Sequence, residues 1–516
     1  MKTITALSPT LKQRWGLFIS LLVIFLLVWI RVNSHKYSFD TTTIFLVFRS
    51  ILFDKDTLIF LEGLGEVNYL NIHFNLAYIL LSPLYFIGPA ALITIWKTSC
   101  YAGFLIVCWR LIDSDERAAL TSFHKNLFIL LVAIHPTFIA NLIAPNIWDS
   151  DLILPLIALS IFYNKRHNYF RGLLFFCLTF LVKEDMMLVG IFYGILLVFH
   201  ARNIKFIWLS IFSLIWFFIV THIIMPSFAI SGGKLTLLKF SFGDLGDNIG
   251  EVIISAITNP QLLIKNGFWL RKISSIIVLL ACFGFLPLIG KRALIYLLPG
   301  LSVLGYSLIA AQPYLDYSKH YVLPLFAFLV WASYESYVVL DCKYRPRLVL
   351  FSSAASLFIV ILVQLNMRAW HFYLTPTGNF DTLHKVTREF LPDNVSVLTG
   401  GVGSPWACYK RNCFVLDDFA PDEIEKNKYE YIIVNLRTIF WETLSCSDRL
   451  LSKNLKQLNQ SKMYQAIHYA DDIVLLKRYD IEATIKQPPW SERIDDYVEI
   501  NHDCYKSELM RAARLF

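Results

Sequence analysis

Acidic and polar residues gather directly after the first apolar run of the chain. Asp40 follows the run 15–30 by about ten positions, so its carboxylate is expected just beyond the bilayer surface, ionised and facing substrates held in the membrane. His73 comes later in the same polar stretch. A carboxylate and an imidazole suit the transfer of protons during catalysis. The alternative is that Asp40 caps the helical stretch 41–53 by accepting a backbone N–H bond.

Three ionisable residues interrupt a stretch from Leu173 to Phe199 that is otherwise apolar. Lys183, Glu184 and Asp185 fall at a tight turn between two membrane spans, where charges are costly unless they pair with one another, with a ligand or with a metal. We expect Lys183 and Glu184 to bind substrate and Asp185 to be a metal ligand. An ordinary charged turn is the alternative.

Two further pairs of polar residues stand at the mouths of spans. Asp149 and Asp151 are two residues apart, and such carboxylates could hold Mg²⁺ or Mn²⁺, although either could instead cap a helix. Lys319 and His320 are expected where a lipid phosphate would lie and are candidate substrate-binding residues. The alternative is that Lys319 extends towards the interface and that His320 belongs to the interfacial belt.

The composition is that of a polytopic membrane protein. Of the 516 residues, 56% are hydrophobic and 17% are charged, and the mean hydropathy is +0.53. The formal net charge of +8 says less than the position of each Lys and Arg, because basic residues favour the cytoplasmic side. No nucleic-acid signature accompanies the charge, so the predicted partners are membrane lipids and a membrane-borne substrate.

The apolar runs predict about eleven membrane-spanning helices. The N-terminus lacks a small-x-small cleavage pattern after its first apolar run, which indicates an uncleaved first span. The run 74–87 is short and broken by Pro83, so it is expected to be re-entrant or interfacial. The predicted spans are 15–31, 90–109, 126–143, 151–163, 170–182, 186–200, 206–224, 272–289, 293–311, 321–340 and 348–366.

The basic residues then predict the orientation in a prokaryotic cytoplasmic (inner) membrane. With these spans, one set of connections is short and basic and the other is longer and more acidic, beginning with a large first outer loop at 32–89. The N-terminus is therefore expected inside and the tail outside. All the candidate site residues fall on the outer face or just within it.

The composition changes after Met367 to that of a soluble domain. We expect a transmembrane domain at 1–366 and a small extracytoplasmic α/β domain at 367–516. Cys408 and Cys413 could form a disulfide if the tail faces an oxidising compartment. The expected strands are 395–399, 413–416, 431–434 and 472–477, and the expected helices are 380–390 and 448–463.

The order of these features resembles a prokaryotic family of predicted multi-spanning membrane proteins of unknown function. The resemblance covers roughly residues 35 to 478. The matching segments are Phe39-Asp40, Asn71-Ile-His-Phe74, Leu81-Ser-Pro-Leu-Tyr85, Trp148-Asp-Ser-Asp151, Lys183-Glu-Asp185, Phe285-Leu-Pro-Leu288, His320-Tyr-Val-Leu-Pro324, Leu391-Pro-Asp-Asn-Val-Ser-Val397 and Tyr429-Glu-Tyr-Ile-Ile-Val434.

That family in turn resembles the C-type glycosyltransferases (GT-C), membrane enzymes that take a sugar from a polyprenyl-phosphate carrier on the outer side. The resemblance implies a GT-C-like fold and a catalytic or substrate-binding acid in the first outer loop, which maps to Asp40, with His73 in the same loop. The chain departs from the family at Val47 and Phe48, where members often have Gln and Trp. It also has Asp149 and Asp151 where they often have His and Glu.

The sequence therefore favours transfer of a sugar from a polyprenyl-phosphate carrier to an unidentified acceptor outside the membrane. Asp40 is the expected base, and Lys183, Lys319 and His320 are the expected partners of the departing phosphate. The alternatives are a transporter or flippase of a lipid-linked substrate and a non-catalytic envelope scaffold. The absence of an internal repeat speaks against a transporter.

Overall fold

The computed structural model describes most of the chain between residues 13 and 479. The described residues are 13–33, 39–55, 57–61, 65–115, 120–144, 146–228, 242, 245–246, 249–259, 261, 269–310, 315–340, 344–366, 378–393, 395–399, 407–408, 412–415, 424, 428–435, 454, 456–458, 460 and 463–479.

Backbone contacts divide the chain into two compact units. Unit 1 comprises Met1–Ile30, Asn68–Leu81 and Thr94–Phe372. Unit 2 comprises Arg31–Val67, Ser82–Ile93 and Tyr373–Phe516. The helices α2 and α6 cross the division between the two units.

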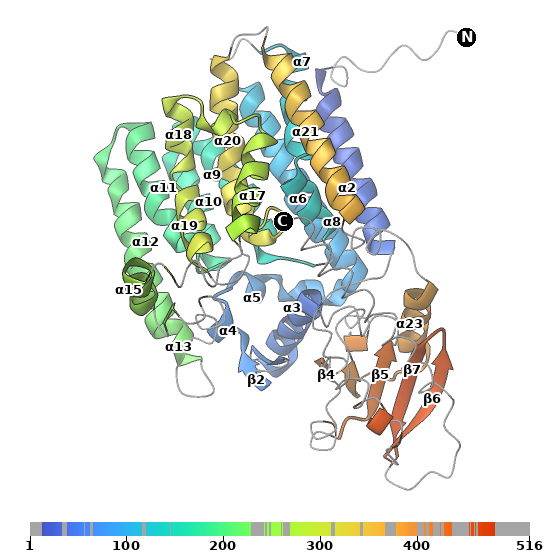
Figure 1. Ribbon diagram of the computed structural model, residues 1–516. Coiled ribbons are helices and arrows are strands. Elements are labelled where there is room, and N and C mark those ends of the chain that lie inside the picture. Colours follow the sequence, from blue (N-terminus) through green and yellow to red (C-terminus); the bar gives the residue numbers. More distant parts are fainter. Residues whose placement is uncertain are drawn as a thin grey trace, which may run out of the picture. The chain divides into compact units, whose positions relative to one another are not determined.

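Unit 1 is a bundle of helices, many of which lie side by side with roughly parallel axes (Figure 1). Apolar sequence explains this arrangement, because a helix in a bilayer satisfies all its backbone hydrogen bonds internally. Its helices are α2 (Trp15–Asn33), α4 (Tyr69–Ile72), α5 (Ala77–Leu81), α6 (Pro89–Asp113), α7 (Ser122–Ala133), α8 (Pro136–Ile143), α9 (Asp149–Lys165), α10 (Tyr169–Leu178), η3 (Thr179–Leu181), α11 (Met186–Ala201), η4 (Ile204–Phe206), α12 (Ile207–Ile219), η5 (Val220–Ile224), α13 (Met225–Ser227), α15 (Ile249–Thr258), α17 (Trp269–Ala281), η7 (Leu286–Leu288), α18 (Lys291–Leu297), α19 (Gly300–Ile309), η8 (His320–Val322), α20 (Leu323–Val339) and α21 (Arg345–Asn366).

A helix lies at each predicted span, but the count of eleven is not confirmed. In the part of the chain that the structure describes, four helical segments are long and apolar enough to cross a membrane, or up to six if two bent pairs are each one span. In one pair, α7 and α8 meet at 54°, and Pro136 begins the second helix. In the other, α18 and α19 meet at 56°. Prolines at these bends explain why one long apolar run gives two shorter helices.

Helix α20 runs through the interior of the bundle. Of its most apolar window, 89% is buried, whereas the other three long candidates are 33% to 50% buried. It packs against α9, α18 and α19. A span that is apolar and buried all round is a central helix, whereas the exposed faces of α2, α6 and α12 are suited to lipid.

Helices α11 and α12 approach closely through small residues. Gly190 and Gly194 are four residues apart on α11, and they face Ser213 and Ser210 of α12. A Cβ atom at Gly194 would lie 2.7 Å from the backbone nitrogen of Ser210. The Ser210 hydroxyl donates a hydrogen bond of 2.6 Å to the Ile191 carbonyl. Spacing of small residues by four is typical of close helix pairs in membranes.

Replacing Gly194 with Ala is therefore expected to destabilise the protein by roughly 1–3 kcal/mol, because the new methyl group meets the Ser210 backbone nitrogen as well as the Ser210 hydroxyl, and backbone cannot turn aside. Thermal unfolding in nanodiscs measures the change. Gly305→Ala is the matched control: it lies inside α19 with nothing within 4 Å, so Ala should be neutral or stabilise by up to about 1 kcal/mol. Equal melting temperatures for the two variants would contradict the close approach.

Unit 2 contains a five-stranded mixed sheet in the order β4-β3-β5-β7-β6. β3 pairs in parallel with β4 and with β5, and β7 pairs antiparallel with β5 and with β6. All five residues of β5 are buried, as expected of a central strand. Helix α23 (Gly378–Glu389) precedes the sheet in the chain, and the strands are β3 (Ser396–Thr399), β4 (Asn412–Val415), β5 (Tyr431–Asn435), β6 (Tyr464–Ala470) and β7 (Ile473–Arg478).

Most of the predicted tail elements are confirmed, and β6 is an addition to them. The four expected strands correspond to β3, β4, β5 and β7, and the helix expected at 380–390 corresponds to α23. The helix expected at 448–463 is described only at single residues and one short turn. The Cys408–Cys413 disulfide is present, with a Cα–Cα distance of 4.9 Å.

Unit 2 also includes much of the stretch predicted as the first outer loop. This stretch is folded into α3 (Phe39–Arg49), η1 (Ser50–Asp54), β1 (Leu58–Leu61), β2 (Gly65–Asn68) and η2 (Ser82–Ile87). The ring of Tyr85 lies 6.0 Å from that of Phe45 and 5.9 Å from that of Phe53, so aromatic packing fixes η2 against α3 and η1.

Candidate functional site

A cluster of buried and half-buried ionisable side chains lies at one end of the unit 1 bundle, where several elements begin or turn. His73 follows α4, Asp149 begins α9, His320 begins η8, and the triplet 183–185 forms the turn between η3 and α11. We call this group the outer cluster; its members are His73, Asp149, Lys183, Glu184, Asp185 and His320.

His73 and Glu184 form the first ion pair of the outer cluster. The Nδ1 atom of His73 lies 3.3 Å from Oε1 of Glu184, and the backbone N–H of Phe74 donates to Oε2 at 3.1 Å. Both carboxylate oxygens of Glu184 therefore have partners on the segment after α4. The side chain of Asn71 anchors the same segment by donating to the Met225 carbonyl at 2.9 Å.

The surroundings favour the charged forms of both partners. Burial alone would lower the pKa of His73, but the hydrogen bond and charge of Glu184, with the charge of Asp149, raise it above its ordinary 6.5. Burial alone would raise the pKa of Glu184, but the hydrogen bond and charge of His73 and the charge of Lys183 lower it. His73 is thus held ready to carry a proton near neutral pH.

Lys183 and Asp185 form the second ion pair. Their Nζ and Oδ2 atoms are 3.2 Å apart, and the Tyr306 hydroxyl donates to the same Oδ2 at 2.9 Å. The Lys183 ammonium also lies 4.7 Å from the centre of the Tyr321 ring. The Oδ1 atom of Asp185 is buried without a hydrogen-bond partner within the described part of the chain, so it has the capacity to accept a bond from a ligand.

His320 presents an unused nitrogen beside an aromatic surface. Its ring stacks on that of Trp148 at 3.6 Å, and its Nδ1 atom is buried with no hydrogen-bond partner among the described residues. The charges of Lys183, Lys319 and His73 all act on it. The side chain of Lys319 is exposed at the edge of the outer cluster. The unused Nδ1 atom of His320 can bind a polar atom of a ligand, while the Trp148 ring covers an apolar face of the same ligand.

Asp151 belongs to a separate network beside the outer cluster. Its Oδ2 atom lies 2.8 Å from Nζ of Lys97, and its Oδ1 accepts from the Tyr101 hydroxyl at 2.8 Å. Oδ2 also accepts from the backbone N–H of Trp148 at 3.1 Å, which fixes the first turn of α9. Lys97 donates in addition to the Asn141 carbonyl at 2.8 Å.

The three acids expected to hold a metal do not form one site. Among the described residues, no group of three or more His, Cys, Asp or Glu side chains is arranged to hold a metal ion. Asp151 is occupied by Lys97 and Tyr101, and Asp185 by Lys183 and Tyr306. A role for Mg²⁺ or Mn²⁺ stays a prediction, and no chemical step is assigned to a metal.

A family model for predicted membrane proteins, DUF2079, matches residues 44–475. This chain belongs to the DUF2079 family. No match was found among curated proteins. Among solved structures, the cryo-EM structure of the arabinofuranosyltransferase AftD from Mycobacteria is similar, with a TM-score of 0.42 and 13% identity. The match covers 91% of this chain and 40% of the AftD chain.

In this DUF2079 protein, Asp40 is the second residue of α3 and belongs to unit 2. The helix begins at Phe39, so Asp40 lies within the first turn and does not precede it. Its side chain is outside the described residues. The role of base therefore stays a prediction from the sequence.

The sequence reasoning missed two residues that bind Asp151 beside the outer cluster and one that binds a member of the cluster itself. Lys97 and Tyr101 lie four residues apart on one face of α6, and Tyr306 reaches the cluster from α19. Lys97 had a signal, because a lone charge inside an apolar run marks a functional or structural site. Tyr101 and Tyr306 had none, since tyrosines are common in the apolar runs of this chain.

Proposed function

We propose that this protein is a membrane glycosyltransferase that transfers a sugar from a polyprenyl-phosphate carrier to an acceptor on the outer side of the membrane. The observation that carries the proposal is the pairing of His73 with Glu184 next to the pairing of Lys183 with Asp185. Lys183 and Glu184 are buried, and His73 and Asp185 are half-buried. Among the described residues, one atom of Asp185 and one of His320 have no hydrogen-bond partner, and such a group of ionisable side chains is more than helix packing requires.

In the proposed reaction, the oxygen or nitrogen of the acceptor attacks the anomeric carbon of the sugar. The bond from that carbon to the phosphate oxygen breaks, and its electron pair leaves with the polyprenyl phosphate. The acceptor's proton passes to a base, the role that the sequence gives to Asp40. Lys183, Lys319 and protonated His73 supply positive charge to the departing phosphate.

Glu184 is then a positioning residue. It holds the imidazole of His73 in one orientation and favours its protonated form. His320 completes the proposed site with its unused Nδ1 atom, which could accept from a sugar hydroxyl against the Trp148 ring.

Native mass spectrometry of the full chain in nanodiscs tests this proposal. Wild type and Asp40→Asn are incubated with a panel of polyprenyl-phosphate-linked sugars and with the bare polyprenyl phosphates. We expect both proteins to retain one sugar-carrier and the wild type alone to release its sugar. Asp316→Asn is a control, because that carboxylate is engaged by Arg271 and lies outside the outer cluster.

Two results would count against the proposal. If no carrier is retained in a membrane-like lipid background, both the transferase and a flippase of the same substrate fail. If carriers are retained and none ever loses its sugar with any acceptor tested, binding without bond breaking would favour the flippase.

A further inference from the structure

The carboxylate of Asp185 is shared between a cation and a hydroxyl group. Its Oδ2 atom lies 3.2 Å from Nζ of Lys183 and accepts a hydrogen bond of 2.9 Å from the Tyr306 hydroxyl. The Lys183 ammonium also lies 4.7 Å from the centre of the Tyr321 ring. Each member of the ion pair therefore has a second partner. If the ammonium turns towards a ligand, Tyr306 still holds the carboxylate in place.

Carboxylates outnumber cations among the members of the outer cluster. Protonated His73 is matched by Glu184, and Lys183 is matched by Asp185. Asp149 adds a third carboxylate, whose charge acts on both pairs. Burial raises the pKa of the Asp185 carboxyl and Lys183 lowers it, while Glu184 and Asp149 also raise it. The neighbouring carboxylates thus already oppose further negative charge at this place.

The two forms of the proposed carrier differ in charge. A phosphate that links a polyprenyl chain to a sugar is a diester with one negative charge, whereas the bare polyprenyl phosphate is a monoester with close to two. Even with Lys319 at its edge, the outer cluster is at most neutral. The side chains of Lys183 and Asp185 are 4% and 16% exposed, and charges shielded from water in this way interact more strongly than charges in solution.

We infer that Asp185 makes the outer cluster favour the sugar-linked carrier over the bare carrier, and so promotes release of the carrier after transfer, an assignment that rests on the proposed function. Lys183 can turn from Asp185 to the phosphate of either form. The carboxylate stays beside it and repels the monoester more strongly than the diester.

The second oxygen of Asp185 adds to this preference. Its Oδ1 atom is buried and has no hydrogen-bond partner among the described residues. A hydroxyl group of a linked sugar can donate to this atom, whereas a phosphate dianion has no hydrogen atom to donate. The sugar-linked carrier can therefore satisfy a buried acceptor that the bare carrier leaves unsatisfied.

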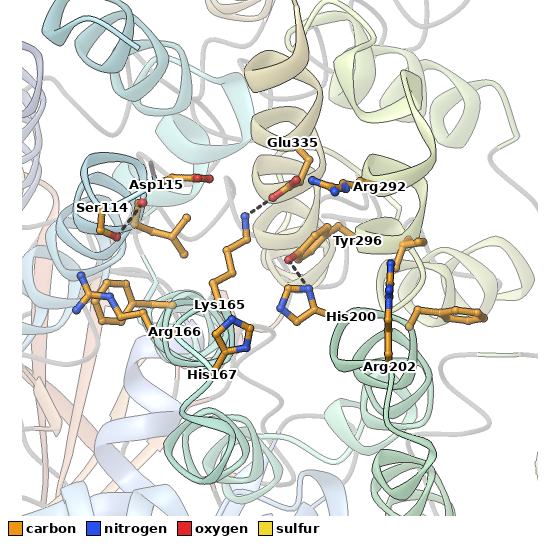
Figure 2. Close-up of a pocket in the computed structure, with 14 residues that line it drawn as sticks. Ser114, Asp115, Lys165, Arg166, His167, His200, Arg202, Arg292, Tyr296 and Glu335 are labelled. Carbon is orange, nitrogen blue, oxygen red and sulfur yellow. Dashed lines mark hydrogen bonds and ion pairs between the residues drawn. The ribbon is translucent and has the colours of Figure 1, made fainter. Parts of the chain in front are cut away.

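A second pair of lysine and carboxylate provides a matched control. Lys165 and Glu335 form an ion pair beside a cavity of about 490 Å³ (Figure 2). The ammonium of this pair also lies 5.2 Å from the centres of two tyrosine rings. Helix α9 begins at Asp149 in the outer cluster and ends at Lys165, about 25 Å away. Glu335→Gln therefore removes a comparable carboxylate far from the proposed carrier site.

Calorimetry on the full chain in phosphatidylcholine nanodiscs tests the role of Asp185. The probes are farnesyl phosphate, which is a monoester, and its methyl ester, which is a diester with the same isoprenoid chain. Binding is measured at about pH 8, where the monoester carries close to two negative charges. The ratio of the two dissociation constants is compared between wild type, Asp185→Asn, Tyr306→Phe and Glu335→Gln. Structural damage to the site would weaken both probes alike and leave this ratio unchanged.

Asp185→Asn is expected to strengthen binding of the monoester about tenfold more than binding of the diester, because the extra charge of the monoester no longer meets a carboxylate. Tyr306→Phe should move the ratio the opposite way by about threefold, because Asp185 loses its hydroxyl donor and holds Lys183 more tightly. Glu335→Gln should leave the ratio as it is in wild type.

The possible failures are distinguishable. If wild type binds neither probe, the carrier site is absent and the proposed function fails with it. If wild type binds both probes and Asp185→Asn leaves the ratio unchanged, or Glu335→Gln changes it equally, only the role of Asp185 is overturned. If Asp185→Asn does not fold, Tyr306→Phe decides, and a ratio equal to that of wild type overturns the same role.

Discussion

Replacing Glu184 with Gln is expected to lower the rate of sugar transfer by about 100-fold or more. Gln keeps the shape of the side chain but has a single acceptor oxygen, so it can accept from only one of His73 and the Phe74 N–H. The change therefore removes the negative charge and one of the two acceptors. Without that charge, burial dominates and the pKa of His73 falls below its present raised value. Transfer is measured with the sugar-carrier that the wild type consumes.

The same variant has a readout that does not depend on activity. The pKa of His73 is raised in the folded protein, so its contribution to stability is fully present below about pH 6.5 and is lost as pH rises through the raised value. The pKa of Glu184 is lowered, so its contribution is present above about pH 4.5 and is lost as pH falls through the lowered value. The ion pair therefore stabilises most between these two limits.

Thermal unfolding of wild type and Glu184→Gln should differ most near pH 5.5 and much less near about pH 8.5. The charged groups that face His73 from other elements are Glu184, Asp149 and Lys183, and His320 is also affected by its charge. Asp113→Asn is the control, since its pair with Lys125 is exposed and should contribute less than about 1 kcal/mol. An unfolding difference that is the same at both pH values would refute the pairing.

Replacing Lys97 with Met is expected to destabilise the protein by about 3–5 kcal/mol. Lys97 and Asp151 are at most 1% exposed, and their charged atoms are 2.8 Å apart. Removing the ammonium leaves a carboxylate buried without its counter-charge, which is the most costly way to break such a pair. Thermal unfolding in nanodiscs measures the loss.

A double-mutant cycle separates the pair from its surroundings. Lys97→Met combined with Asp151→Asn should recover part of the stability lost in Lys97→Met, because neither charge is then left alone. Tyr101→Phe is the milder control, since it removes one hydrogen bond to Asp151 and should cost about 1 kcal/mol. If Lys97→Met unfolds like wild type, the network does not fix the start of α9.

The sequence indicated much of the outer cluster because charge in an apolar context has few explanations. The triplet 183–185 interrupts an apolar run, and charges there are expected to pair or to bind a ligand. The structure brings this triplet together with His73, Asp149 and His320, which the sequence placed on the same face. The sequence assigned these residues to one face because short connections rich in Lys and Arg alternate along the chain with longer, more acidic connections.

Other features depended on packing that the sequence does not display. Asp149 and Asp151 look equivalent in sequence, yet Lys97 from a distant helix pairs with Asp151. The number of spans was ambiguous because bends at the α7–α8 and α18–α19 junctions divide long apolar runs. Strand β6 carries mostly half-buried and exposed residues, so its sequence lacks the apolar alternation that marks a strand.

The Cys408–Cys413 disulfide closes a loop between cysteines only five positions apart. Such a bond can form as soon as this short piece of the nascent chain meets an oxidant, without waiting for the sheet to assemble. Cysteines in the bacterial cytosol remain reduced, whereas those exported to the periplasm are oxidised. The redox state of this one loop, read by alkylation of thiols in growing cells, therefore records whether the tail was exported during biogenesis.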